Sequence, residues 1–160
     1  MATEEKIIAA NAVYDTLCEM LNESGWSFEK KEERKGVVTT VPGTSLTIML
    51  IIECSVERQV IKIYSLLPFR IPKEKRVEGA IAINEINCSF GIGSFDYQAL
   101  DGSIMYRLTS PFAKCSISKE LIWHLIDMAC AVIDMYSENL HLFSQGLMEY
   151  DEVSDIFKSL

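Results

Sequence analysis

Two neighbouring stretches in which apolar and polar residues alternate constrain the fold of this chain more than any other feature. Residues 45–54 (SLTIMLIIEC) and 59–67 (QVIKIYSLL) alternate with the two-residue period of β-strands. The residues between them, SVER, make a connection of ordinary hairpin length. We therefore expect an antiparallel hairpin in which Cys54 pairs with Gln59. This register turns one apolar set toward the helices, namely Leu46, Ile48, Leu50, Ile52, Ile61, Ile63 and Leu67.

The opposite face of this hairpin is also apolar. Its residues are Met49, Ile51, Val60, Tyr64 and Leu66. A sheet face in contact with water is normally polar, and monomers rarely expose an apolar patch of more than a few hundred Å². We therefore expect the chain to self-associate through this face as a two-fold homodimer, with another protein as the alternative partner. The alternative is that the C-terminal tail covers the face through Val153, Ile156 and Phe157.

Helix and strand signals fill the rest of the chain. Thr3 and Ser118 are placed to cap two helices, and Gly25 and Gly146 suit their ends. The expected segments are an N-terminal helix in 1–25, strands in 26–67, a helix in 73–90, a hairpin in 93–110, a long helix in 118–146 and a tail helix in 148–158. They predict an α+β fold with the order α-β-β-β-β-α-β-β-α. In it, two to three helices pack on an antiparallel sheet of five to six strands, in a single domain of residues 1–160.

A second hairpin follows the middle helix. Asp101-Gly102 is a preferred pair for a two-residue type I′ turn. Such a turn places Asp96 directly opposite Arg107, where the two side chains form a cross-strand ion pair. Upstream of the helix, Pro68 is expected to end the strand that begins near residue 59.

The middle helix carries two asparagines three residues apart. Asn84 and Asn87 are expected on one side of the helix, with Ile81 and Cys88, and we expect that side to be buried. A buried amide needs hydrogen-bond partners, so the two asparagines are expected to tie the helix to the sheet or to the turn at 91–94. Contact with a ligand is the alternative.

The charge of the chain excludes several classes of partner. The net charge is −8, and the segment from Glu120 onward holds eight acidic residues and one lysine. An acidic protein repels phosphate backbones and anionic lipids, so we expect no nucleic acid and no membrane as partners. No apolar run reaches the roughly 20 residues that span a bilayer. Residues 1–15 lack the basic start of a signal peptide, which indicates a cytoplasmic protein.

No arrangement of reactive side chains predicts a catalytic, cofactor-binding or metal site. Glu138 and His141 have the spacing of half a di-iron motif, but the only other histidine is His124, on the same helix. The sequence Gly-Ile-Gly-Ser at 91–94 lacks the third glycine and the following helix of a phosphate-binding turn. We therefore expect no cofactor and no enzymatic activity. The cysteines are widely spaced and expected to be buried thiols, and they are Cys18, Cys54, Cys88, Cys115 and Cys130.

A series of short motifs in the C-terminal half resembles a known family. The motifs are a helix with Asn87, a Gly-x-Phe strand at Gly93 to Phe95, a turn at Asp101-Gly102, Tyr106-Arg107 in the next strand, and Ile-Ser-x-Glu at Ile117 to Glu120. Their order and spacing between Pro68 and Gly146 resemble the YbjN family of bacterial proteins, which are described as sensory transduction regulators. The resemblance implies a fold similar to type III secretion chaperones, which are small, acidic and usually homodimeric. It supplies no catalytic residues.

Three functions are compatible with these features. The first is a non-enzymatic cytosolic regulatory or chaperone-like module that binds another protein, in bacterial signal transduction. The second is a type III secretion chaperone that binds an extended effector segment. The third is a small-ligand-binding protein or enzyme that uses the region 84–94.

Overall fold

The computed structural model describes residues 2–159, including the side chains of residues 2–155. The helices and strands are α1 (Glu4–Glu23), β1 (Phe28–Lys31), β2 (Gly36–Pro42), β3 (Thr47–Ser55), β4 (Val60–Arg70), α2 (Arg76–Ser89), β5 (Ser94–Gln98), β6 (Ser103–Pro111), α3 (Lys119–Ser144) and α4 (Tyr150–Ser159). Two short 3₁₀ turns, η1 (Glu32–Arg34) and η2 (Lys73–Lys75), connect β1 to β2 and lead into α2. This order confirms the predicted α+β fold.

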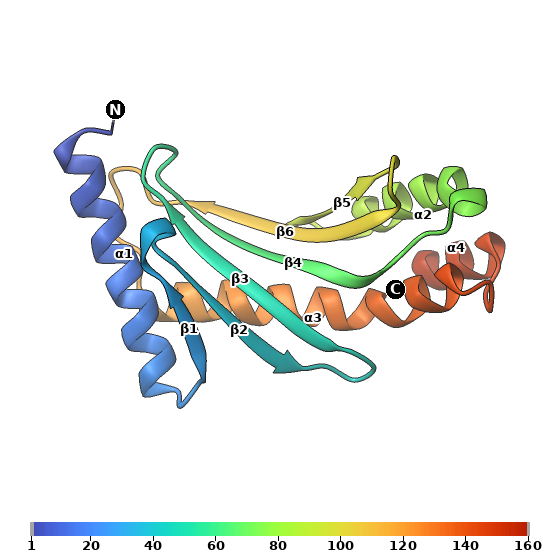
Figure 1. The fold of residues 1–160 in the computed structure, drawn as a ribbon, viewed down its shortest axis with the longest axis horizontal. Coiled ribbons are helices and arrows are strands. Elements are labelled where there is room, and N and C mark those ends of the chain that lie inside the picture. The colour runs from blue at the N-terminus through green and yellow to red at the C-terminus, as the bar shows by residue number, and fades with distance from the viewer. Residues whose placement is uncertain (1, 160) are drawn as a thin grey trace.

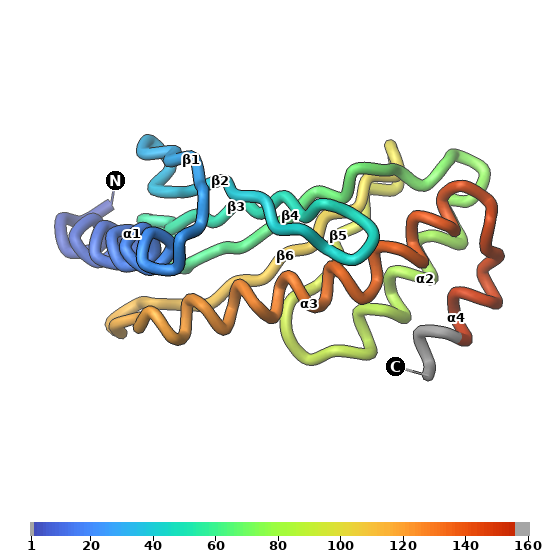
Figure 2. Tube along the Cα trace, turned by 90° about the horizontal axis from the view of Figure 1, so that it is seen from below, coloured from blue at the N-terminus to red at the C-terminus, as the bar shows by residue number. Residues whose placement is uncertain are grey.

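The sheet and the helices form two layers. Six antiparallel strands follow the order β1-β2-β3-β4-β6-β5. The long helix α3 packs on β3, β4 and β6, α1 packs on β3, and α2 packs on β5 (Figure 1). Figure 2 shows the sheet as one layer and α3, α2 and α4 on the same side of it. The opposite face of the sheet carries none of the described helices.

The two longest helices begin and end at the residues that the sequence marks. Thr3 and Ser118 each accept a hydrogen bond from the backbone N–H three residues further on, at 3.4 and 3.2 Å. Gly25 and Gly146 follow the last turns with φ of +71° and +72°, the left-handed conformation that favours glycine. These local signals therefore predict the helix boundaries.

The hairpin of β3 and β4 has a register that differs by two residues from the predicted one. Cys54 pairs with Ile61 in place of Gln59, and the loop is residues 56–59. Gln59 has a left-handed φ of 52° and donates its N–H to the carbonyl of Ser55, so the loop closes one residue later than expected. Because the shift is even, the side chains within β3 and β4 stay on their predicted faces.

The core lies between this hairpin and the helices. Its β3 and β4 side chains are Ile48, Leu50, Ile52, Cys54, Ile61, Ile63 and Leu67, all of them buried. The prediction that Leu46 joins them is wrong, because Leu46 precedes β3 and is only half-buried. Leu67, the predicted partner of Leu46, is buried nevertheless.

The β5–β6 hairpin also differs from its predicted register by two residues. Gln98 pairs with Ser103, so the turn consists of residues 99–102 rather than the Asp-Gly pair alone. The N–H of Gly102 donates to the carbonyl of Gln98 at 2.8 Å, and the N–H of Ile71 donates to the carbonyl of Gly102 at 2.8 Å. The turn is therefore fixed by the connection between β4 and α2 as well as by its own sequence.

The strand β4 continues through Pro68 to Arg70, beyond its predicted end. The pairs that β4 makes with β3 run from Val60 to Tyr64, and its register with β6 shifts between Leu66 and Arg70. The missing N–H of Pro68 therefore falls where the ladder is already interrupted, a position at which strands tolerate proline.

Candidate functional site

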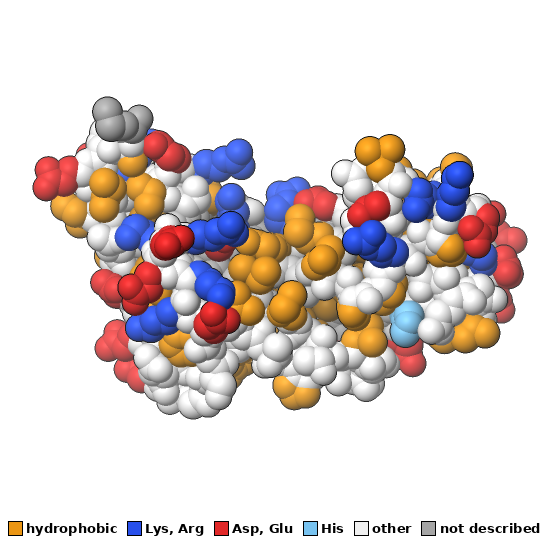
Figure 3. Space-filling model, in the orientation of Figure 1, with side chains coloured by type: hydrophobic (Ala, Val, Ile, Leu, Met, Phe, Trp, Pro, Cys, Tyr) orange, Lys and Arg blue, Asp and Glu red, His pale blue; other side chains and the backbone are white. Residues whose placement is uncertain are grey.

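The sheet face without helices displays a band of apolar side chains. The residues that the sequence analysis assigned to this face lie there: Met49 and Leu66 are 41% and 49% exposed, and Ile51, Val60 and Tyr64 are half-buried. Figure 3 shows hydrophobic side chains gathered across the middle of this face, with Lys, Arg, Asp and Glu on both sides. We call these five residues, together with Val38 and Met105, the apolar band.

Val38 and Met105 extend the band onto the neighbouring strands. Val38 on β2 pairs with Ile51, which pairs in turn with Tyr64 on β4. Met105 on β6 pairs with Leu66. Neither residue is among those predicted for this face. Each lies between buried neighbours in its strand, so the two-residue period of a strand would have placed it there.

An ion pair borders the band on β5 and β6. Nε and Nη2 of Arg107 donate to the carboxylate of Asp96 at 2.6 and 2.9 Å. Asp96 pairs with Met105 and Arg107 with Ser94, so the two charges lie diagonally rather than directly opposite as predicted, on the same face. The hydrogen bonds from Arg107 hold the pKa of Asp96 below its usual value.

Charges of both signs also lie on this face of β3 and β4, where Lys62 separates Val60 from Tyr64. Glu53 pairs with Lys62 across the two strands, and Nη1 of Arg34 lies 3.7 Å from Oε1 of Glu53. Burial, followed by the hydrogen bond with Glu53, raises the pKa of Tyr64 to about 12. The Tyr64 phenol therefore stays neutral at pH 7 and keeps its hydrogen-bond donor. An apolar centre with a border of mixed charge suits a protein surface better than a phosphate backbone.

The tail helix does not cover this band. Helix α4 packs on α2 and α3, where Val153 is fully buried and the phenol of Tyr150 donates to Oε1 of Glu85 at 2.8 Å. Figure 2 places α4 in the helix layer, across the sheet from the band. The prediction that Val153 covers the face is therefore wrong. The side chains of Ile156 and Phe157, the other two residues of that prediction, lie outside the described residues.

The two asparagines of α2 have different surroundings. Asn87 donates to the carbonyl of Phe95 at 2.9 Å and accepts from its N–H at 2.8 Å, so its amide occupies the outer edge of β5. Asn84, Ile81 and Cys88 are exposed, so their predicted burial is wrong. The buried side of α2 consists instead of Gly79, Ala82, Ile83 and Ile86.

Polar side chains of α3 contact the sheet rather than forming a reactive group. The carboxylate of Asp134 accepts from the N–H and the hydroxyl of Thr44 at 2.6 and 2.7 Å, which fixes the turn between β2 and β3. The ring of His141 stacks on Phe69 with centroids 4.8 Å apart. Among the described residues, no three or more His, Cys, Asp or Glu side chains are grouped so that they could hold a metal ion.

The cysteines divide between core and surface. Cys18 and Cys54 are buried and Cys130 is half-buried, while Cys88 and Cys115 are exposed, contrary to the prediction. Cys88 lies on the outward side of α2, and Cys115 lies in the connection between β6 and α3. Burial raises the pKa of Cys54 to about 12 and that of Cys130 to about 11, so neither is a thiolate at pH 7.

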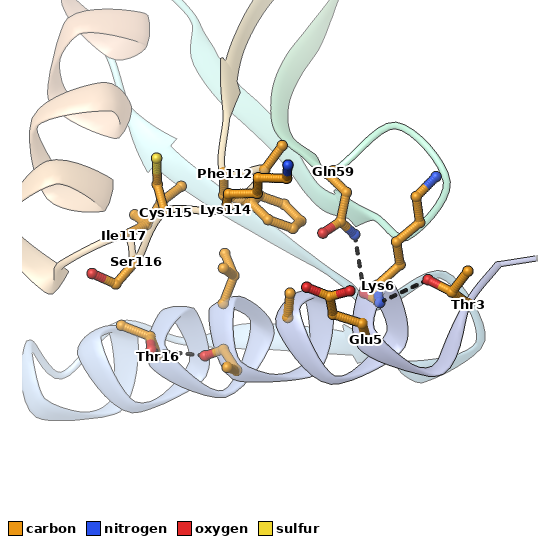
Figure 4. A pocket seen from close by; sticks show the side chains of 14 residues that line it. Thr3, Glu5, Lys6, Thr16, Gln59, Phe112, Lys114, Cys115, Ser116 and Ile117 are labelled. Atoms are coloured by element: carbon orange, nitrogen blue, oxygen red, sulfur yellow. Dashed lines mark hydrogen bonds between the residues drawn. The ribbon is translucent and has the colours of Figure 1, made fainter.

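A cleft of about 460 Å³ lies between α1 and segment 112–117, away from the apolar band (Figure 4). Val13 and Phe112 form part of its buried apolar lining. Gln59 bridges its walls, because Nε2 donates to the carbonyl of Lys6 at 3.0 Å. The sequence does not predict this cleft, because its walls come from segments far apart in the chain. It lies at α1 rather than in the predicted ligand region 84–94.

Comparison with solved structures supports the fold. The crystal structure of "YbjN, a putative transcription regulator from E. coli" superposes with a TM-score of 0.56 at 15% identity, over 76% of this chain and 85% of that chain. A chain of the HopA1–SchA chaperone–effector complex superposes with a TM-score of 0.46 at 14% identity, over 76% of this chain and 93% of that chain. No curated protein matches the sequence. No helix among the described residues has the length and apolar character needed to cross a membrane.

The sequence also matches one family model over most of its length. The model is described as "YbjN: Putative bacterial sensory transduction regulator", and it matches residues 14–142. This segment runs from the middle of α1 nearly to the end of α3, so it contains every strand of the sheet and the whole apolar band. The chain therefore belongs to the YbjN family.

Proposed function

We propose that this chain is a non-enzymatic, cytoplasmic regulatory or chaperone-like module that binds another protein through its apolar band. The observation that carries the proposal is the sheet face itself. On this face Ile51 pairs with Tyr64, Met49 and Leu66 are exposed, and none of the described helices covers them. An apolar patch of this kind, bordered by charge, is the usual mark of a protein interaction site.

The edges of the sheet favour binding on the face over addition of a strand. At the β5 edge, the amide of Asn87 already occupies the N–H and carbonyl of Phe95. The β1 edge carries the exposed charges Glu29, Lys30 and Lys31, which discourage strand pairing. A chaperone that holds an extended effector segment therefore remains the second candidate, with the segment lying across the face rather than extending the sheet.

A small-ligand or enzymatic function is the third candidate, and the cleft beside α1 is the observation that favours it. Its volume of about 460 Å³ is that of a small-molecule site. Its lining residues, all of them described in the structure, include no histidine that could act as a base for the Cys115 thiol or the Ser116 hydroxyl. Most of the accessible lining is apolar, and this favours binding over catalysis.

A capture experiment with matched variants tests the proposed function. The tagged chain is incubated with extract of its own cells, and bound proteins are identified by mass spectrometry for wild type and Met49→Lys. We expect a partner that wild type retains and that Met49→Lys loses at least tenfold, because a lysine in the band would have to be desolvated on binding.

Ile7→Lys is the matched control. Ile7 on α1 is 41% exposed, as is Met49, so the two substitutions change the surface equally outside and inside the band. A protein retained by wild type and Ile7→Lys but lost by Met49→Lys supports the proposal. Equal capture by all three forms rejects the apolar band as the binding surface.

A further inference from the structure

The cleft beside α1 has an apolar floor and an open wall. Val13 on α1 and Phe112 and Ile117 on the opposite side are buried and line the floor. Ala9 and Ala12 also face the cleft, and their small side chains leave its α1 wall open. The volume of about 460 Å³ and this lining are typical of sites that bury the apolar body of a small molecule.

Gln59 holds the two walls of the cleft together. Its backbone carbonyl accepts from the N–H of Phe112 at 2.8 Å. Its side chain is only 7% exposed, and Nε2 donates to the carbonyls of Lys6 and Val56 at 3.0 and 2.7 Å. These bonds fix both the walls and the orientation of the amide, so the cleft is formed before any ligand enters.

The same bonds leave one polar atom of Gln59 available to a ligand. Both N–H groups of the amide are used, and Oε1 accepts no hydrogen bond from any described residue. Figure 4 shows this oxygen directed into the cleft. The amide cannot turn over, because its oxygen would then face two carbonyl oxygens. A buried acceptor is stabilised by a donor, so a ligand that fits this end of the cleft must supply one.

Glu5 adds a negative charge at the same end of the cleft. Its side chain faces Gln59 from the first turn of α1 (Figure 4), and within the described chain it has no ion pair and no hydrogen bond. The neighbouring cation is directed elsewhere, since Nζ of Lys6 donates to the carbonyl of Glu57 at 2.9 Å and lies 3.9 Å from its carboxylate. This end of the cleft therefore favours a donor that is positively charged.

We propose that the cleft binds a small primary amine with an apolar body. Its ammonium group donates to Oε1 of Gln59 and to the carboxylate of Glu5, and its body packs on Phe112. An ammonium group has three donors and no acceptor, so it suits an end that offers two acceptors and a negative charge. The net charge of −8 also attracts a cation. The site rests on the ligand-binding candidate function and is independent of protein binding by the apolar band.

Lys114 offers the alternative of an anionic ligand. It is exposed, lies beside Phe112 on the wall opposite α1 (Figure 4), and makes no ion pair with another described residue. No hydrogen bond holds its side chain, so the side chain would have to be ordered when a ligand binds. The amide of Gln59 is already fixed by two hydrogen bonds, and a fixed acceptor binds its ligand at a lower cost in entropy.

Three probes that share a phenylethyl group test the charge that the cleft selects. They are phenethylamine, 2-phenylethanol and 3-phenylpropionate, each titrated into the full chain and followed by ¹H–¹⁵N NMR. We expect phenethylamine to shift the amide signals of Ala9, Gln59 and Phe112, which line the cleft, and to bind about fivefold more tightly than the alcohol. Equal affinity for the amine and the alcohol, or no shift with any probe, overturns the proposal. Tightest binding of the carboxylate overturns it as well, and assigns the cleft to anions through Lys114.

Two matched pairs of variants locate the binding. Glu5→Gln should weaken phenethylamine about fivefold and leave the alcohol unchanged, because only the amine loses a charge partner. Glu4→Gln is its control, since Glu4 is also exposed in the first turn of α1 but does not line the cleft. Ala12→Trp should fill the cleft and abolish binding, while Ala80→Trp, at an exposed alanine of α2, should not. Equal weakening by Glu5→Gln and Glu4→Gln, or full binding by Ala12→Trp, overturns this site.

The protein-capture assay separates this site from the proposed function. Ala12→Trp should capture the same protein partner as wild type, because Ala12 lies outside the apolar band. Met49→Lys should bind phenethylamine as wild type does, because Met49 does not line the cleft. Circular dichroism confirms that both variants are folded. Loss of phenethylamine binding in Met49→Lys would contradict a separate ligand site beside α1.

Discussion

Gly102 shows how one residue connects two distant segments. Its φ is +78°, and a Cβ built on it would lie 2.0 Å from the carbonyl oxygen of Ile71. The backbone of residue 71 therefore approaches the hairpin turn as closely as glycine allows, and its N–H donates to the Gly102 carbonyl. The sequence signal Asp-Gly is correct about the need for glycine but incorrect about the turn, because the contact with Ile71 selects the longer loop.

Gly102→Ala should destabilise the fold much more than Gly146→Ala. Both glycines have left-handed φ, which costs an alanine about 1–2 kcal/mol. Only Gly102 also has a close neighbour, since nothing lies within 4 Å of a Cβ on Gly146. The clash adds about 1–3 kcal/mol, which urea unfolding of both variants measures. Equal losses would contradict the close approach.

The ion pair of Asp96 and Arg107 predicts a dependence of stability on pH. Arg107 lowers the pKa of Asp96 in the folded state, so the pair stabilises the fold above the unfolded pKa of about 3.9 and loses this effect as pH falls through the lower folded pKa. Asp96→Asn should therefore be less stable than wild type at pH 7 by about 0.2–1 kcal/mol, since the pair is partly exposed. Urea unfolding at pH 7, 5 and 3 should show this difference shrinking toward the lowest pH. A constant difference would assign the loss to packing.

At the scale of elements, the hairpins separate what alternation predicts from what it does not. In both hairpins the predicted faces are right and the predicted pairs are shifted by two residues. Alternation determines which side chains share a face, while register depends on loop closure, which here uses the left-handed φ of Gln59 in one loop and a backbone contact in the other. The buried side of α2 does not follow from periodicity alone, because Ile81 on the exposed side and Ile83 on the buried side are both apolar.

Asn87 and Asn84 offer a matched test of how α2 holds the sheet edge. Asn87→Ala removes both hydrogen bonds to Phe95, whose backbone is then unpaired in a buried position, so we expect a loss of about 1–3 kcal/mol. Asn84→Ala, at an exposed position on the same helix, should change the stability of the single chain by less than about 0.5 kcal/mol. Denaturant unfolding at concentrations where the chain is monomeric compares the two.

Hydrogen exchange supplies a local readout for the same pair of variants. The Phe95 amide should exchange faster in Asn87→Ala than in wild type, because its N–H loses the side-chain acceptor at the edge of β5. Exchange at Phe95 should be unchanged in Asn84→Ala. Faster exchange in both variants would indicate that α2 as a whole, and not the Asn87 amide, protects this edge.

At the scale of the whole molecule, the sequence predicts the order of elements and five residues of the apolar band. It does not predict whether a helix covers the band, because that depends on where the helices pack in three dimensions. Val38 and Met105 join the band only through the strand order β2-β3-β4-β6, which brings segments from different hairpins together. The cleft beside α1 has the same origin, since Val13 and Phe112 meet only in the folded chain.

Removal of α4 tests whether the tail and the apolar band are independent. A chain that ends at Gly146 loses the burial of Val153 and the contact of Tyr150 with Glu85, so it should unfold at a lower temperature. The lost burial of Val153 alone is worth about 1.5–3 kcal/mol. Because α4 packs on α2 and α3, across the sheet from the band, the shortened chain should capture the same partner in the same amount as the full chain.

The two chains are compared at a temperature at which circular dichroism shows that both are folded. Increased capture by the shortened chain would mean that the tail competes for the band, and only such competition would make α4 a regulator of this surface.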